Sequence, residues 1–229
     1  MRRIFVLLMT LPLLVLPARA AYGSKYIALT FDDGPSGKYT RALLDGLYDR
    51  GVRATFLLCG YRIKDYPDIT QRIFDEGHEI GYHGYSHDPM QGMSRRNIAQ
   101  ELMDTEALLP QGCRPVFLRP PGGFSSEAVQ QVAQARGLAI LHWSVDPGDW
   151  ATHDTAAIEK AVLGQVKDGD IILLHDMSDS SVKAALDIVD ALLKQDYEFV
   201  TVSELARLRG IKPKPGMTYK KFPGKEEVK

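Results

Sequence analysis

The chain has 229 residues, a length that fits one large domain better than two small ones. Its content of 45% hydrophobic and 25% charged residues is ordinary for a globular protein. The formal net charge of −1 provides no strong attraction to polyanions, so we expect no nucleic-acid partner.

The first 20 residues have the pattern of a secretory signal peptide. Residues 1–3 are basic, residues 4–17 are apolar, and Ala18-Arg19-Ala20 forms an Ala-x-Ala cleavage site. The apolar stretch is too short and too often interrupted by proline for a spanning helix. An uncleaved anchor is the alternative. We expect export, with removal of residues 1–20, no stable membrane insertion, and a place outside the cell, in the cell envelope or in the periplasm.

After the signal peptide, apolar segments of strand type alternate with segments of helical periodicity. Strands are expected at residues 26–31, 53–58, 79–82, 116–119, 139–145, 171–174 and 199–202. Helices are expected at residues 39–50, 69–76, 95–109, 126–136, 155–167, 181–195 and 203–208. Seven strand–helix units favour a parallel sheet with right-handed crossovers, which forms a (β/α) barrel if all helices lie on one side.

A doubly wound open sheet is the alternative architecture. Its nucleotide-binding version is weakened because no glycine-rich phosphate loop follows the first strand. We expect the domain to span residues 21–210. Residues 211–229 are rich in Lys, Pro and Gly and have no apolar period, which predicts a basic, extended or disordered tail.

Two adjacent carboxylates, Asp32 and Asp33, follow the first predicted strand within the segment 30–35. The carboxyl ends of parallel strands are where α/β proteins build their sites. Adjacent residues on a strand point to opposite faces, so the two carboxylates are expected to have different roles. A simple turn is the alternative, because Asp, Gly and Pro all favour turns.

A histidine pair follows the third predicted strand. His83 and His87 are four residues apart, a spacing that places two side chains on the same side of a helical turn. With Asp33 they offer two imidazoles and one carboxylate, the ligand set of a catalytic zinc with open positions. Solvent-exposed histidines without a metal are the alternative.

Three further strand ends carry polar groups. Arg119 ends the fourth strand and can hold a carboxylate by a forked hydrogen bond. Asp146, Asp149 and Trp150 follow the fifth strand, and the indole of Trp150 can form the floor of a sugar site. His175 ends the sixth strand, where a buried core histidine is the alternative.

Taken in order, these five segments resemble the motifs of the polysaccharide deacetylases of carbohydrate esterase family 4, the NodB-homology domain. The resemblance covers residues 24–209 and rests on residues 30–35, 83–87, 119–121, 146–150 and 173–175. It implies a distorted (β/α) barrel of about seven parallel strands. It also implies a metal-dependent hydrolase that removes N-acetyl groups from N-acetylglucosamine-type units of an extracellular or cell-wall polysaccharide, such as peptidoglycan, chitin oligomers or an exopolysaccharide.

The resemblance implies a role for each residue that matches a motif. One divalent metal, usually zinc in the family, would be held by Asp33, His83 and His87. Asp32 would be the catalytic base, and Arg119 would orient it. His175 would be the general acid, tuned by Asp149 or Asp146. Gly122, Trp150 and Leu173 would contact the substrate, with the backbone N–H of Gly122 on the oxyanion and Leu173 in the acetyl pocket.

The sequence departs from the family pattern at two glycines. Gly84 stands where the family often has Ser or Thr, so a hydroxyl that braces the loop is missing. Gly122 stands where an aromatic residue usually follows the prolines, so a wall of the substrate groove is missing. The backbone N–H at Gly122 remains, and the departure therefore concerns the substrate more than the chemistry.

Two other functions stay open from the sequence. One is an amidohydrolase of small cyclic amides or imides on the same fold, which export and Trp150 disfavour. The other is a non-catalytic glycan-binding module, which the complete set of Asp and His residues disfavours. We expect a monomer with a glycan substrate. Cys59 and Cys113 are expected at opposite ends of the sheet, which disfavours a disulfide although export permits one.

Overall fold

The computed structural model describes residues 25–224. The expected signal peptide, residues 1–20, lies outside the described residues. Within residues 25–224, no helix combines the length and apolar character needed to cross a bilayer.

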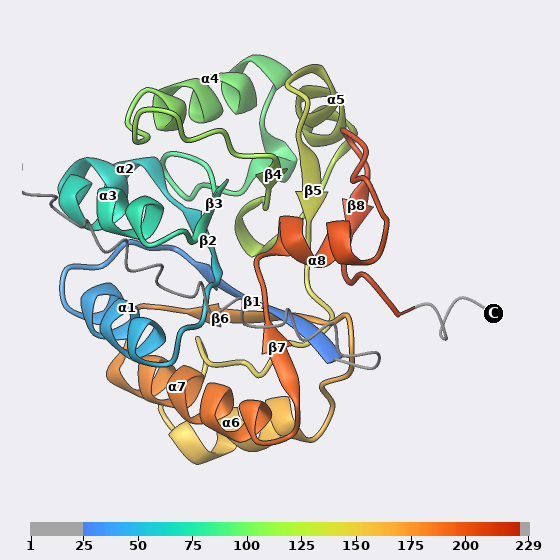
Figure 1. The fold of residues 1–229 in the computed structure, drawn as a ribbon. Helices are drawn as coiled ribbons and strands as arrows, with labels where there is room; N and C mark the ends of the chain where they lie inside the picture. The colour runs from blue at the N-terminus through green and yellow to red at the C-terminus, as the bar shows by residue number, and fades with distance from the viewer. Residues whose placement is uncertain (1–24, 225–229) are drawn as a thin grey trace, which may run out of the picture.

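Eight strands form one sheet in which every named pair of strands is parallel (Figure 1). They are β1 Lys25–Asp32, β2 Thr55–Leu58, β3 Glu79–Tyr82, β4 Phe117–Leu118, β5 Ala139–Leu141, β6 Ile171–His175, β7 Tyr197–Phe199 and β8 Thr218–Tyr219. Their order is β6-β1-β2-β3-β4-β5-β8, and β7 pairs with the first part of β1.

The structure describes eight α-helices, of which all but α8 lie around the outside of this sheet (Figure 1). They are α1 Tyr39–Asp49, α2 Gly60–Asp65, α3 Pro67–Asp75, α4 Arg95–Glu106, α5 Glu127–Ala135, α6 Thr155–Leu163, α7 Asp179–Leu193 and α8 Val202–Leu208. Most cross over between successive parallel strands, as the strand–helix alternation of the sequence predicts.

The sheet curls until its two sides meet. Val145, downstream of β5, forms an isolated parallel bridge with Ile172 of β6. In this bridge Leu173 N–H donates to the carbonyl of Val145 at 2.9 Å. The curled sheet confirms the predicted distorted (β/α) barrel.

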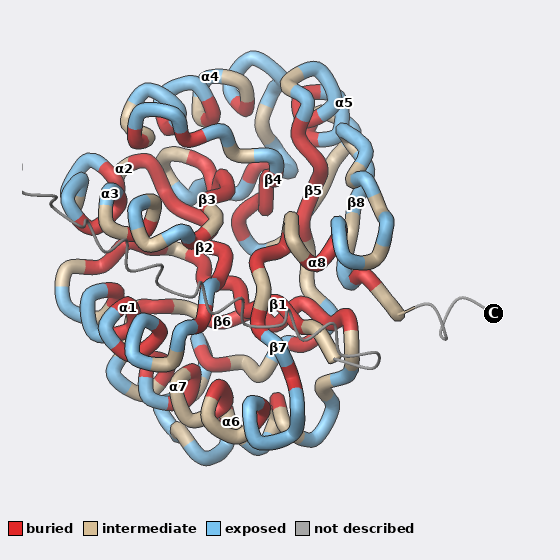
Figure 2. Tube along the Cα trace, viewed as in Figure 1, coloured by how far each residue is buried: buried red, intermediate tan, exposed pale blue. Residues whose placement is uncertain are grey.

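Alternating residues of β1 enter two separate cores, as the strand period requires. Ile27, Leu29 and Phe31 pack between the sheet and the outer helices. Ala28 faces the other way and belongs to the barrel interior, which also contains residues of α8. Figure 2 shows strands β2 to β6 largely buried, while β8 and the outer sides of the helices are more exposed.

Helix α8 covers the amino-terminal ends of the strands. Val202 N–H donates to the Thr55 hydroxyl at the start of β2, at 3.0 Å. Thr201 begins α8 through a capping box with Glu204. The expected strand at 199–202 is therefore shifted, since the observed β7 lies at Tyr197–Phe199. With α8 at one end, the carboxyl ends of the strands form the open end of the barrel.

The expectation of a tail beyond residue 210 is wrong for residues 211–224. Thr218 and Tyr219 pair with β5, and Phe222 is fully buried in the barrel interior. Phe222 N–H donates to the carbonyl of Gly169 at 2.8 Å. Because this pairing adds β8, the sheet has one strand more than the seven predicted. Residues 225–229 lie outside the described part of the chain.

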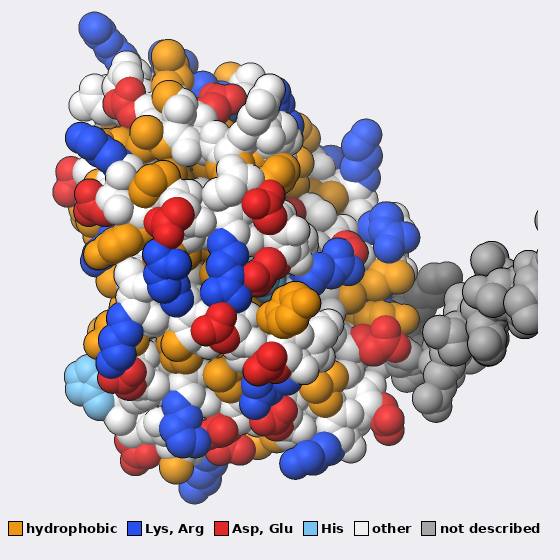
Figure 3. Space-filling model, turned by 60° about the vertical axis from the view of Figure 1, so that its left-hand side comes forward, with side chains coloured by type: hydrophobic (Ala, Val, Ile, Leu, Met, Phe, Trp, Pro, Cys, Tyr) orange, Lys and Arg blue, Asp and Glu red, His pale blue; other side chains and the backbone are white. Residues whose placement is uncertain are grey.

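Cys59 and Cys113 are both buried and free, in agreement with the prediction that they do not pair. Figure 3 shows one face of the molecule, on which acidic and basic side chains are interspersed. This mixed pattern agrees with the formal net charge of −1.

Candidate active site

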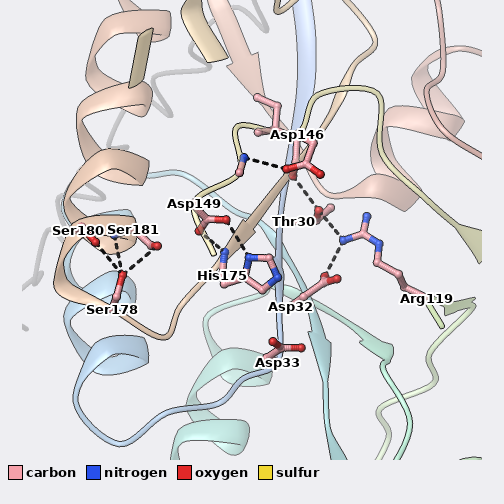
Figure 4. A network of polar contacts seen from close by, with 12 residues as sticks. Thr30, Asp32, Asp33, Arg119, Asp146, Asp149, His175, Ser178, Ser180 and Ser181 are labelled. Carbon is pink, nitrogen blue, oxygen red and sulfur yellow. Dashed lines mark hydrogen bonds and ion pairs between the residues drawn. The ribbon is translucent and has the colours of Figure 1, made fainter. Parts of the chain in front are cut away.

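Asp32 and Asp33 separate at the end of β1. Asp32 is the last residue of the strand and is buried. Asp33 has φ +70°, a left-handed conformation that takes the chain out of the strand. The two carboxylates therefore diverge as predicted, but a left-handed turn separates them rather than the alternation of a strand (Figure 4).

Arg119 lies directly after β4 and is completely buried. Its Nη1 donates to Asp32 Oδ1 at 2.6 Å and to the Thr30 hydroxyl at 2.8 Å. Its other nitrogens donate to the carbonyls of Leu141 and His142, at 3.3 and 2.9 Å. These bonds hold the guanidinium in one orientation, and the guanidinium in turn fixes Asp32 through a single bond rather than a fork.

His83, Asp33 and His87 bring three potential ligand atoms within 4.8 Å of one another. His83 Nδ1 lies 2.8 Å from the carbonyl of Arg119 and must donate to it, because a carbonyl only accepts. In the neutral ring, Nε2 of His83 then carries a lone pair. That nitrogen faces Asp33 Oδ1 at 3.2 Å, and His87 Nε2 faces the same oxygen at 3.0 Å.

Asp33 Oδ1 is buried and receives no hydrogen bond from any described group. A carboxylate oxygen and two imidazole nitrogens that converge in this way fit a divalent metal. Burial alone would raise the pKa of Asp33, but the two imidazoles hold it far below its usual range. The neighbouring imidazoles therefore favour the ionised carboxylate of Asp33.

The loop from His83 to His87 is not helical. The expectation that a helical turn brings the two histidines to the same side is therefore wrong. Gly84 and His87 both have positive φ, +84° and +66°. Glu101 of α4 shapes the loop by accepting the backbone N–H groups of Tyr85 at 2.6 Å and Ser86 at 2.8 Å.

Thr105, one turn further along α4, donates to the carbonyl of Gly84 at 3.0 Å. A Cβ at Gly84 would lie 2.9 Å from the Met90 methyl group, so this loop conformation suits glycine. Glu101 and Thr105 thus brace this loop from α4. Sequence reasoning missed both residues, because their spacing within α4 is that of any helix.

His175, the last residue of β6, is paired with Asp149. Its Nδ1 lies 2.8 Å from Asp149 Oδ1, and its backbone N–H donates to Asp149 Oδ2 at 2.8 Å (Figure 4). Burial lowers the pKa of His175, but the hydrogen bond and charge of Asp149, with the charges of Asp32 and Asp33, raise it to about 9. His175 is therefore protonated at neutral pH.

Asp146 does not contact His175, so the alternative in which it tunes the histidine is not supported. Its Oδ1 accepts the backbone N–H of Gly148 at 2.9 Å, within the loop that follows β5. Gly148 has φ +69°, and the turn that it permits carries Asp149 to His175. Asp149 is buried, whereas Asp146 is exposed.

A cavity of about 460 Å³ opens among these strand ends. All predicted site residues line it except Arg119 and Asp149, which support Asp32 and His175 from behind. Gly122, Leu173 and Trp150 are among the lining residues. Phe124 and Trp143 also line the cavity, and the sequence did not mark either as a site residue.

A possible Asp-His-His metal cluster beside a carboxylate and an Asp-supported histidine is typical of a metal-dependent hydrolase. Comparison with known proteins agrees with this class. Residues 19–141 match the family described as polysaccharide deacetylase. The chain is 38% identical over 191 residues to a peptidoglycan-N-acetylglucosamine deacetylase of Bacillus cereus, a match that covers 81% of this chain and 90% of that protein. The chain belongs to the polysaccharide deacetylase family.

Another relative and a solved structure support the same assignment. A peptidoglycan-N-acetylglucosamine deacetylase of Listeria monocytogenes is 37% identical over 184 residues, and the match covers 80% of this chain but 39% of that longer protein. The solved structure of a family 4 acetyl xylan esterase from Clostridium thermocellum, in complex with a cobalt ion, aligns with a TM-score of 0.79 and 36% identity. That alignment covers 87% of this chain and all of the esterase chain.

Proposed function

We propose that this protein is a metal-dependent deacetylase that removes N-acetyl groups from N-acetylglucosamine-type units of an extracellular or cell-wall polysaccharide. The observation that supports it most directly is the convergence of His83, His87 and Asp33, with His83 Nε2 at 3.2 Å from Asp33 Oδ1, next to Asp32 and His175. The proposed substrate follows from the relatives, whose names specify N-acetylglucosamine in peptidoglycan.

Asp33, His83 and His87 would hold one divalent metal. Zinc is the proposed ion, because nitrogen and carboxylate ligands in this number suit a catalytic zinc. When bound, the ion would polarise the acetyl carbonyl and make water a stronger nucleophile at neutral pH.

Asp32 is the proposed general base. Arg119 holds one of its oxygens at 2.6 Å, and Asp32 lines the cavity. As a water oxygen attacks the acetyl carbon, Asp32 takes a proton from that water. The backbone N–H of Gly122 is proposed to donate to the developing oxyanion, and such donors are typically worth about 3–4 kcal/mol.

His175 is the proposed general acid. Its Nδ1 is occupied by Asp149, so Nε2 is the atom left to donate. Breaking of the carbon–nitrogen bond sends the electron pair to nitrogen, which takes the proton from His175. The products are acetate and a free amino group on the sugar, and no other reactant is needed.

Export completes the proposal, because a polysaccharide of this kind lies outside the cytoplasm. The support is the Ala18-Arg19-Ala20 site in the segment outside the described residues. N-terminal sequencing of the protein from its native source should return a start near Ala21, and an intact Met1 would contradict export by this route.

Acetate release from a panel of acetylated substrates tests the proposed function. The panel contains peptidoglycan, chitin oligomers, an N-acetylated exopolysaccharide, acetylated xylan and a cyclic imide. We expect acetate from at least one N-acetylglucosamine polymer. Activity only on xylan would make the protein an esterase, and ring opening of the imide alone would make it a cyclic amidohydrolase.

A further inference from the structure

Two exposed aromatic side chains line the catalytic cavity. Phe124 is 56% exposed and Trp150 is 69% exposed. They come from different loops, one after β4 and the other after β5. An exposed aromatic ring at a catalytic cavity offers a flat apolar face, which is typical of a surface that contacts substrate.

The loop of Phe124 is shaped around two consecutive glycines. Gly122 and Gly123 have φ of +66° and +71°, which favour glycine at both positions. A Cβ at Gly122 would lie 3.0 Å from two ring atoms of Phe124, and a Cβ at Gly123 would lie 2.6 Å from the indole of Trp143. The ring of Phe124 thus lies directly against the backbone of residue 122.

The resemblance noted in the sequence implies an aromatic side chain at residue 122, and this chain has glycine there. The close contact means that a side chain at 122 and the ring of Phe124 would compete for the same space. The ring of Phe124 can therefore occupy this place only because residue 122 has no side chain.

We infer that Phe124 is a specificity-determining residue, whose ring stacks on the apolar face of a pyranose unit of the substrate. This inference rests on the proposed function and assigns recognition of the sugar ring to a particular side chain. The carbon–hydrogen face of a hexosamine and the face of an aromatic ring are complementary apolar surfaces. Phe124 would favour acetyl groups carried by a sugar over the same group on a molecule without a ring.

The test compares two substrates in the full-length metal-loaded enzyme. Acetate release is measured from the N-acetylglucosamine trisaccharide and from ethyl acetate, which has an acetyl group but no sugar. For Phe124→Ala, the ratio of kcat/KM for the trisaccharide to kcat/KM for ethyl acetate should fall roughly 10-fold, which is the effect expected from the loss of a single aromatic contact. The change should come mainly from a higher KM for the trisaccharide. Phe124→Trp should retain the ratio, and Phe124→Leu should lose most of it.

The matched control is Tyr48→Ala on α1. Tyr48 is an aromatic side chain that is 72% exposed and has no place in the cavity. This variant should keep the wild-type ratio. An unchanged ratio in Phe124→Ala would overturn the inference, as would an equal loss on both substrates, which would mean that Phe124 acts through the loop. A wild-type enzyme that hydrolyses ethyl acetate but no N-acetylated glycan would instead overturn the proposed function.

Discussion

At the end of β1, two neighbouring carboxylates have different surroundings. Asp32 accepts a hydrogen bond from the buried Arg119, while Asp33 Oδ1 faces the Nε2 atoms of two histidines. A carboxylate held by a guanidinium and free on its other side suits proton transfer. A carboxylate between two imidazoles suits a metal. The two carboxylates belong to adjacent residues, and the left-handed turn at Asp33 directs them to different surroundings.

Substitution of each aspartate by asparagine should separate metal binding from chemistry. Asp32→Asn keeps the metal near full occupancy but loses roughly 10²–10⁴ in rate, the usual contribution of a general base. Asp33→Asn removes a charged ligand, so both metal content and rate should fall. Metal content and turnover are measured on the same preparations. If Asp32→Asn loses its metal while Asp33→Asn keeps it, the two roles are reversed.

Asp149 should set the pH range of activity through His175. The general acid is active when protonated, and the pKa of His175 is about 9, so the rate should fall as pH rises through that value. Asp149→Asn removes the hydrogen-bonded negative charge that raises this pKa, so the fall should move to lower pH. The pH–rate profile of the variant measures this shift. Asp146→Asn is the control, because Asp146 does not contact His175; an equal shift in this control would contradict the assignment.

Among the elements, helix α4 supports the candidate metal cluster although it holds no ligand itself. Glu101 of α4 receives two backbone N–H groups from residues 85 and 86, between the two histidines. Loops without regular structure need such anchors to hold ligands in one geometry.

Removal of this anchor should weaken the metal site. Glu101→Ala should lower metal affinity roughly 10-fold or more, the effect expected when support of a ligand is lost. Titration calorimetry of the metal-free protein measures the affinity without reference to activity. Gln100→Ala on the exposed side of the same helix is the control and should bind metal like the wild type. Equal affinities in all three proteins would show that the loop holds its shape without Glu101.

Helices and strands with a clear apolar pattern of their own were predicted well from the sequence. The strands β1 and β6 are continuous apolar runs and were placed within one residue at each end. Helix α2 was missed, because its six residues form on the end of β2 without an apolar period of their own. Strand β8 was missed because its short pairing with β5 depends on tertiary structure.

Some features of the candidate site could be predicted from the sequence, and others depend on the folded loops. Residues at strand ends could be grouped, because parallel strands bring their carboxyl ends together. The choice between Asp146 and Asp149 could not be made, since it depends on the turn at Gly148. Phe124 could not be recognised, because only the folded loop brings its ring against Gly122.

At the scale of the whole molecule, the barrel is completed by residues that the sequence placed outside the domain. Phe222 fills part of the barrel interior together with α8, at the end opposite the cavity. The described part of the C-terminal segment therefore contributes to the stability of the entire fold.

Phe222→Ala should lower the free energy of unfolding by about 3–5 kcal/mol, the usual cost of a buried Phe-to-Ala change. Chemical denaturation measures the difference. Met217→Ala in the same segment is the control, because Met217 is 56% exposed and should change stability little. Wild-type stability in Phe222→Ala would mean that this segment does not belong to the core.

We propose that Asp33, His83 and His87 hold a metal on which deacetylation depends. The most direct test is acetate release from an N-acetylglucosamine polymer by one preparation of the protein in three states: as isolated, after complete removal of metal, and after return of one equivalent of zinc. We predict activity in the first state, loss in the second, and recovery in the third. Full activity after elemental analysis has shown the metal to be absent would contradict the account.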